Sequence, residues 1–81
     1  KRTGRNRMLR NVLIAIANSG DPAFVEASVL PHLDDEAPLV RGAAIWALAR
    51  LDPARFEDEK ARRADTETDE TVRAEWSARQ R

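Results

Sequence analysis

The side chains best suited to chemistry in this sequence are basic. The first ten residues carry five basic groups and no acidic group. Guanidinium groups match the geometry of phosphate oxygens and need no proton transfer, so this stretch predicts a phosphate-contacting strip. The same stretch also fits a solvated, partly disordered tail, and Gly4 in its middle predicts a bend or a close approach. The candidate phosphate contacts are Lys1, Arg2, Arg5, Arg7, Arg10 and Arg41.

Few residues in this sequence are suited to catalysis or to metal binding. The chain has no cysteine and one histidine, which excludes disulfides, thiolate zinc sites and iron-sulfur ligation within it. His32 fits an ordinary solvent-facing or helix-end imidazole. Trp46 and Trp76 fit packing between repeats, with stacking on a nucleobase as the alternative. The acidic run 57–59 predicts a solvated helix face. We therefore predict no catalytic residue, no metal and no cofactor in this chain.

The elements that would position these groups repeat along the sequence. The triplet Asp21-Pro22-Ala23 recurs 31 residues later as Asp52-Pro53-Ala54. An aliphatic-arginine pair also recurs in nearly the same register, ending in Arg10, Arg41 and Arg73. A period of this size indicates stacked supersecondary units, each too small to bury its apolar face alone.

Each unit is predicted to be a helical hairpin. The apolar spacing predicts helices over 7–18, 22–33, 38–51, 53–64 and 69–80 and no strand, so the expected fold is all-α, an α-α superhelix of about two and a half repeats. Gly20 is placed as a left-handed C-cap, Asp21 and Asp52 as N-caps, and Pro31 should make the second helix irregular. Phe56 is expected to hold the charged fourth helix. The residues expected to be buried are Val12, Ile16, Val29, Leu33, Ala44 and Leu48.

An acidic turn, residues 34–36, precedes the third helix, and the arginine lies one turn into that helix. Turn carboxylates cap free amide groups, and an arginine at this point can bridge to the turn of an adjacent repeat. We expect Arg41 and Arg73 to form such a ladder, which would set the register between repeats. Ligand binding by these two arginines is the alternative.

Length and charge narrow the classes of protein further. The chain has 81 residues, enough for a single domain, 1–81, but for little buried pocket volume. Fourteen basic and fourteen acidic residues cancel, so no global field attracts nucleic acid or membrane, and the apolar run 12–17 is too short to span a bilayer. The first residue is lysine. We expect a piece of a larger, cytoplasmic protein, and we expect it to be a monomer.

Two stretches narrow the identification to a family. Residues 10–21, RNVLIAIANSGD, and residues 38–51, PLVRGAAIWALARL, resemble segments near the C-terminus of the bacterial epoxyqueuosine reductases, in the HEAT-repeat class. Residues 1–5 and 72–76 are also similar to that family's tail. Ala17 and Ala49 stand where the family usually has glycine.

The resemblance implies a function for the parent protein. In that family an upstream catalytic domain holds cobalamin and two 4Fe-4S clusters and reduces epoxyqueuosine to queuosine in the tRNA anticodon loop. The resemblance implies that the C-terminal HEAT-like repeats help to bind the anticodon stem-loop. We therefore expect a non-catalytic tRNA-binding domain with two partners, tRNA and the upstream domain. The rival is a HEAT-type protein-protein scaffold without RNA contact.

Overall fold

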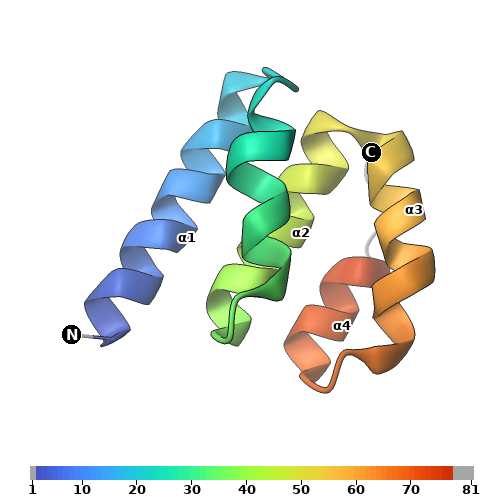
Figure 1. Cartoon of the computed structure of the whole chain (residues 1–81). Coiled ribbons are helices and arrows are strands. Elements are labelled where there is room, and N and C mark those ends of the chain that lie inside the picture. Colours follow the sequence, from blue (N-terminus) through green and yellow to red (C-terminus); the bar gives the residue numbers. More distant parts are fainter. Residues whose placement is uncertain (1, 78–81) are drawn as a thin grey trace.

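The computed structural model describes residues 2–77, with side chains from Gly4 onward. These residues contain helices and no strand, so the predicted all-α class is confirmed (Figure 1). The elements in chain order are α1 (Arg2–Ser19), the π-helix η1 (Val25–Val29), the 3₁₀-helix η2 (Leu30–Asp34), α2 (Pro38–Leu51), α3 (Pro53–Arg63), the 3₁₀ turn η3 (Ala64–Thr66) and α4 (Glu70–Ser77).

Local signals at the helix ends agree with the structure. Gly20 has a φ of 71° and stops α1, because glycine enters the left-handed region without a Cβ clash. The side chain of Asp52 accepts a hydrogen bond from the backbone N–H of Arg55 at 3.1 Å, as an N-cap does. The predicted range 38–51 is the observed range of α2, and the predictions for α3 and α4 differ only at the ends. Residues 78–80 of the predicted last helix lie outside the described residues.

Two predictions of local structure need correction. The expected helix over 22–33 is a π-helix followed by a 3₁₀-helix, because Pro31 has no N–H to continue an α-helical ladder. Asp21 caps the turn before it, accepting from the N–H of Ala23 at 2.9 Å. The predicted bend at Gly4 is wrong: α1 runs through this residue, and a Cβ there would meet nothing within 4 Å.

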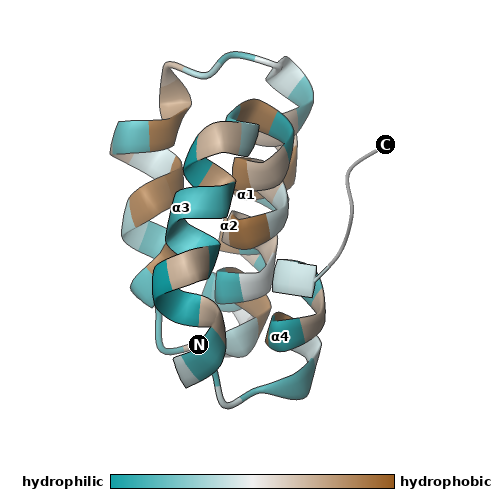
Figure 2. Ribbon diagram, turned by 90° about the vertical axis from the view of Figure 1, so that its right-hand side faces the viewer, coloured by the Kyte–Doolittle hydropathy of each residue, from teal (hydrophilic) through white to brown (hydrophobic). Residues whose placement is uncertain are grey.

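The core is built around α2, which packs against α1, α3, α4, η1 and η2. It is the most apolar helix in the described part of the chain, and α3 is the most hydrophilic (Figure 2). The predicted core residues Val29, Leu33, Ala44 and Leu48 are buried, and Ile16 is partly buried.

One core prediction is wrong, since Val12 is 46% exposed. The buried residues of α1 are Leu13 and Ala17 instead. The run 12–17 is apolar at every position, so its sequence does not reveal which side of the helix meets α2.

The repeat predicted from the sequence appears in two layers. Helices α1, α2 and α4 lie in one layer, and η1, η2 and α3 lie in the other (Figure 1). Asp35 and Glu67 stand 32 residues apart, at the turns before α2 and α4. Each carboxylate accepts a hydrogen bond from the backbone N–H two residues further along the chain. Each also accepts one from an arginine of the preceding long helix: Asp35 from Arg5 of α1, and Glu67 from Arg41 of α2. The same interaction therefore joins both pairs of neighbouring units.

Candidate nucleic-acid interface

The six basic residues predicted to contact RNA fall into three groups. Lys1 and the side chain of Arg2 lie outside the described part of the chain. The guanidinium groups of Arg5 and Arg41 are in ion pairs between units. The side chains of Arg7 and Arg10 are exposed, and neither forms an ion pair with an acidic side chain in the described residues. The structure therefore brings Arg7 and Arg10 together and separates them from Arg5 and Arg41.

The guanidinium group of Arg41 donates hydrogen bonds to three different residues. Its Nη2 lies 2.8 Å from Oε2 of Glu67, and its Nη1 donates to the backbone carbonyls of Asp35 and Glu36 at 3.0 and 3.1 Å. Its side chain is only 17% exposed. The hydrogen bond with Glu67 raises the pKa of Arg41, and it lowers the pKa of Glu67 against the opposing effect of burial. The predicted bridge from Arg41 to the adjacent turn is confirmed.

The other members of the ladder differ from the expectation. Arg5 makes the equivalent bond, with its Nη2 2.6 Å from Oδ1 of Asp35, and this bond lowers the pKa of the carboxyl group. The sequence predicts that Arg73 acts like Arg41, but its side chain is exposed and forms no ion pair with the described residues. No further turn follows α4 among these residues, so Arg73 has no acidic partner to reach.

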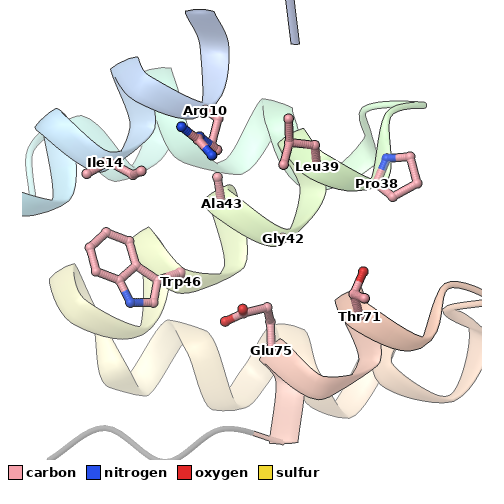
Figure 3. A pocket seen from close by; sticks show the side chains of 9 residues that line it. All are labelled: Arg10, Ile14, Pro38, Leu39, Gly42, Ala43, Trp46, Thr71 and Glu75. Carbon is pink, nitrogen blue, oxygen red and sulfur yellow. The ribbon is translucent and has the colours of Figure 1, made fainter. Parts of the chain in front are cut away.

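The side of α1 that carries Arg10 borders an open hollow of about 450 Å³. Its walls come from α1, α2 and α4 (Figure 3). Arg7, Arg10 and Ile14 follow one another at spacings of three and four residues, so they share this side of the helix. The lining residues are Arg10, Ile14, Pro38, Leu39, Gly42, Ala43, Trp46, Thr71 and Glu75. Of these residues, sequence reasoning had singled out Arg10 as a candidate phosphate contact and Trp46 with base stacking as an alternative, but it did not group the others with them.

The two tryptophans have different surroundings. Trp76 is buried, and its ring lies 5.5 Å from that of Phe56, so it holds α4 against α3, as expected for packing between repeats. Trp46 is half-buried and faces the hollow, with the Arg50 guanidinium 5.0 Å from the ring centroid (Figure 3). This cation–π interaction fixes the position of the indole. The alternative of base stacking thus applies to Trp46 alone.

Glu75 is the acidic group of the hollow. Its side chain extends from α4 into the space beside Trp46 (Figure 3), and it has no hydrogen-bond or ion-pair partner in the described residues. Burial raises the pKa of this carboxyl group. A Cβ at Gly42 would lie 3.7 Å from Cγ of Glu75, so the absence of a side chain at Gly42 keeps the space beside the carboxylate open.

The opposite layer holds a second cluster, centred on Glu59 of α3. This residue is 3% exposed, so the predicted solvated face over 57–59 is wrong at Glu59. Nε of Arg63 and Nε of Arg55 lie 2.7 and 3.1 Å from its carboxylate oxygens, and Arg62 also donates to it. Burial alone would raise its pKa, but the three arginine hydrogen bonds outweigh burial and lower the pKa to about 2.

The same arginines join α3 to the irregular helices of its layer. Arg55 bonds Glu26 at 3.1 Å, and Arg63 bonds Asp34 at 2.5 Å. The sequence signal for Glu59 was the i, i+3 and i, i+4 spacing of its arginines on one helix. The cluster therefore links α3 to η1 and η2, and its guanidinium groups already have partners within the protein.

Possible metal ligands are scattered in the described part of the chain. No group of three or more His, Cys, Asp or Glu side chains there is placed to hold a metal ion. The chain has no cysteine for an iron-sulfur cluster, and Nδ1 of His32 is 2.7 Å from the carbonyl oxygen of Ser28. None of the described helices is long and apolar enough to cross a bilayer.

Comparison with known proteins found one curated relative that bears on this chain. The chain is 30% identical over 77 residues to the epoxyqueuosine reductase of Bacillus subtilis (strain 168), and the match covers 89% of the chain. The chain spans about a fifth, 19%, of the length of that relative. No protein-family model and no solved structure matches. The similarity supports a relation between this chain and the epoxyqueuosine reductase family.

Proposed function

We propose that this chain is a non-catalytic HEAT-like repeat domain of an epoxyqueuosine reductase, and that it contacts the anticodon stem-loop of tRNA through α1. The observation that carries the proposal is the state of Arg7 and Arg10. Both are exposed and both lack an acidic partner in the described residues, although the chain as a whole has as many acids as bases. Guanidinium groups in this state are available to phosphate oxygens.

Sequence and local structure together explain why α1 has free arginines. The first acidic residue of the chain is Asp21, after the end of α1, so no carboxylate on this helix can neutralise Arg7 or Arg10. Arg5, on another side of the same helix, reaches the turn before α2 and is neutralised there by Asp35. The RNA-binding surface we propose is therefore shorter than the six-residue strip expected from the sequence.

The role of such a strip is to position RNA. Phosphate contacts fix the register and orientation of a nucleic acid without reading its sequence. The choice of anticodon would then rest with the upstream catalytic domain, which is also where we place cobalamin, the two 4Fe-4S clusters and the reduction of epoxyqueuosine. We propose that the parent works in the cytoplasm as a monomer, with this domain beside its catalytic domain.

The test replaces Arg7 and Arg10 together by glutamine and measures affinity for an anticodon stem-loop as a function of salt. We expect weaker binding and a shallower salt dependence. The slope of log affinity against log salt should fall by roughly 0.7 to 0.9 for each phosphate that the variant no longer neutralises. The measurement is made on the 81-residue chain and on the full-length parent. Unchanged affinity and salt slope in the parent would show that this face does not bind RNA.

Arg41→Gln is the matched control. Because the Arg41 side chain is bonded to Glu67 and to two backbone carbonyls, its replacement should lower thermal stability and leave the salt slope of binding unchanged. A shallower slope in Arg41→Gln would mean that this arginine exchanges its carboxylate for phosphate in the complex. Arg41 would then be part of the proposed RNA-binding surface.

The second candidate is a protein-protein scaffold. It is favoured by the ion pairs of Arg5 with Asp35 and of Arg41 with Glu67, which use two of the predicted RNA-binding residues to set the register between units. The scaffold predicts that the double variant keeps its tRNA affinity in the parent but no longer binds a protein partner. The same pair of variants therefore separates the two functions.

A further inference from the structure

The hollow between α1, α2 and α4 combines three kinds of surface. Its walls are mostly apolar, with Ile14, Leu39 and the indole of Trp46 among them. A cation, Arg10, borders it on α1, and a carboxylate, Glu75, projects into it from α4 (Figure 3). A volume of about 450 Å³ exceeds that of a single aromatic ring system and is far too small for a folded element.

The carboxylate needs a partner that the described residues do not supply. A half-buried polar group without a hydrogen bond is unfavourable unless water or a ligand satisfies it. Glu75 accepts only when ionised, so a ligand that suits it must present N–H or O–H donors. A ligand that also binds Arg10 must carry a negative charge at another point. A nucleotide has both features, with donors on its base and an anionic phosphate.

We propose that this hollow binds one unstacked guanine base of an RNA strand, with the base beside Trp46, its donor edge at Glu75 and its phosphates at Arg7 and Arg10. The proposal rests on the proposed RNA binding and adds a base-specific subsite to it. Single-stranded bases are commonly recognised in this way, by stacking on an aromatic side chain and by hydrogen bonds to their Watson–Crick edge.

Guanine is favoured over the other bases by the pattern of its donors. Its N1–H and N2–H₂ groups are adjacent, so both can donate to the two oxygens of one carboxylate. The Watson–Crick edges of adenine and cytosine place a ring-nitrogen acceptor beside the amino donor, and uracil has its single N–H between two carbonyl oxygens. In each of those cases an acceptor would face the carboxylate. Such a mismatch loses a hydrogen bond to a charged group.

A protein segment satisfies the hollow less well. A basic side chain would suit Glu75 but would repel Arg10 and Arg7, and an acidic side chain would do the reverse. A peptide would therefore need opposite charges at matched positions as well as apolar groups for Leu39 and Trp46. The test below treats binding of a protein as one of its outcomes.

The experiment compares three pentanucleotides, UUGUU, UUIUU and UUAUU, where I is inosine, which lacks the N2 amino group of guanine. Binding to the 81-residue chain is followed by the NMR shift of the Trp46 indole N–H at fixed salt. We expect UUGUU to bind most tightly, UUIUU less tightly and UUAUU least. Removing a hydrogen bond to a charged group should weaken binding by about tenfold or more.

Glu75→Gln removes the carboxylate and keeps its size. It should reduce the preference for UUGUU over UUAUU to about twofold or less, because the amide offers only one acceptor oxygen. The matched control is Glu70→Gln, an exposed acid on the same helix that does not line the hollow. This control changes the net charge equally and should keep the full preference for guanine.

The outcomes separate the subsite from the proposed function. Equal affinities for the three pentanucleotides, or a preference that survives Glu75→Gln, would overturn the guanine subsite while the salt slope of Arg7→Gln/Arg10→Gln still tests the binding of phosphates. No shift of the Trp46 signal with any of the three would also overturn the subsite. A shift that occurs only when the parent's catalytic domain is added would overturn it too, and would assign the hollow to a protein interface.

Discussion

The two layers of the molecule differ in how many of their arginines have an acidic partner. In the layer of η1, η2 and α3, every arginine of α3 is bonded to a carboxylate, and Glu59 alone accepts from three of them. In the layer of α1, α2 and α4, Arg7 and Arg10 have no such partner in the described residues, and Arg50 lies over an indole instead. All arginines of α3 are thus neutralised, whereas the layer of α1 holds both neutralised arginines, Arg5 and Arg41, and arginines without an acidic partner in the described residues.

The difference follows from where the acids stand. On α3, acids and bases lie within one turn of each other, and Glu59 accepts hydrogen bonds from three arginines of the same helix. On α1 there is no acid at all, and among its described arginine side chains Arg5 alone, which faces the turn before α2, has an acidic partner. A net charge of zero thus conceals a neutralised face and a cationic face.

The largest expected effect on stability concerns α2, which packs against helices of both layers. Leu48 is fully buried in α2, and Leu48→Ala should lower the free energy of unfolding by about 2 to 4 kcal/mol, because the cavity cannot close fully. The change is measured by chemical denaturation. A decrease below about 1 kcal/mol would mean that α2 is not the common core of the two layers.

The next effect concerns Glu59 and depends on pH. Its folded-state pKa of about 2 lies below its ordinary value of 4.5, so its ionised form stabilises the fold above pH 4.5. That contribution disappears as pH falls from about 4.5 to about 2. Glu59→Gln should cost about 2 to 3 kcal/mol at neutral pH and flatten the decline of stability in this window. Denaturation curves from neutral pH down through the window measure both effects.

Glu75→Gln is the counterpart in the other layer, and its sign is opposite. Burial raises the pKa of Glu75, so its charged form opposes folding, and its protonation stabilises the fold as pH falls through the raised value. The variant should therefore be at least as stable as the unchanged chain at neutral pH, as measured by thermal denaturation. A lower stability would show that Glu75 has a structural partner and is not held open for a ligand.

A smaller effect separates the ladder from the free arginines. Arg41→Gln should lower the free energy of unfolding by about 1 to 2 kcal/mol, because it leaves the largely buried Glu67 side chain without its cation. Arg5→Gln should lower stability less than Arg41→Gln does, since the Arg5 side chain is 47% exposed and its ion pair is screened by solvent. Thermal melts at matched pH and salt compare the two variants, and equal decreases would argue against the burial difference as the cause.

The smallest expected effect on stability belongs to Arg7→Gln and Arg10→Gln. Neither side chain has an ionic partner in the described residues, so each change should alter the free energy of unfolding by no more than about 0.5 kcal/mol. Both melting curves and helical circular dichroism should match those of the unchanged chain. A clear drop in stability would remove the contrast between the two layers.

The prediction of the fold from sequence succeeded where one residue decides the geometry. The left-handed stop at Gly20, the cap at Asp52 and the interruption at Pro31 each depend on the backbone chemistry of that residue. It failed where several positions are chemically alike. Val12 and Leu13 are both apolar, and only the packing of α1 against α2 selects Leu13 for the core.

The candidate site could be predicted from the sequence only in part. The basic start of the chain is obvious in the sequence, and Arg10 does border the hollow. Glu75 and Trp46 gave no joint signal, because 29 residues separate them and only the stacking of α4 on α2 brings them together. Sequence reasoning could not have grouped them without the helix packing.

By itself, the sequence determined the all-α class, the period of the units and the ends of α2, since these depend on local propensities and on residues close in the chain. Only the tertiary structure decided which arginines are neutralised. The partners of Arg5, Arg41, Arg55 and Arg63 across the units stand 26 to 30 residues away, and ion pairs across that separation exist only after the units have stacked. Composition counts charges, whereas packing places them within the few ångströms over which a pair forms.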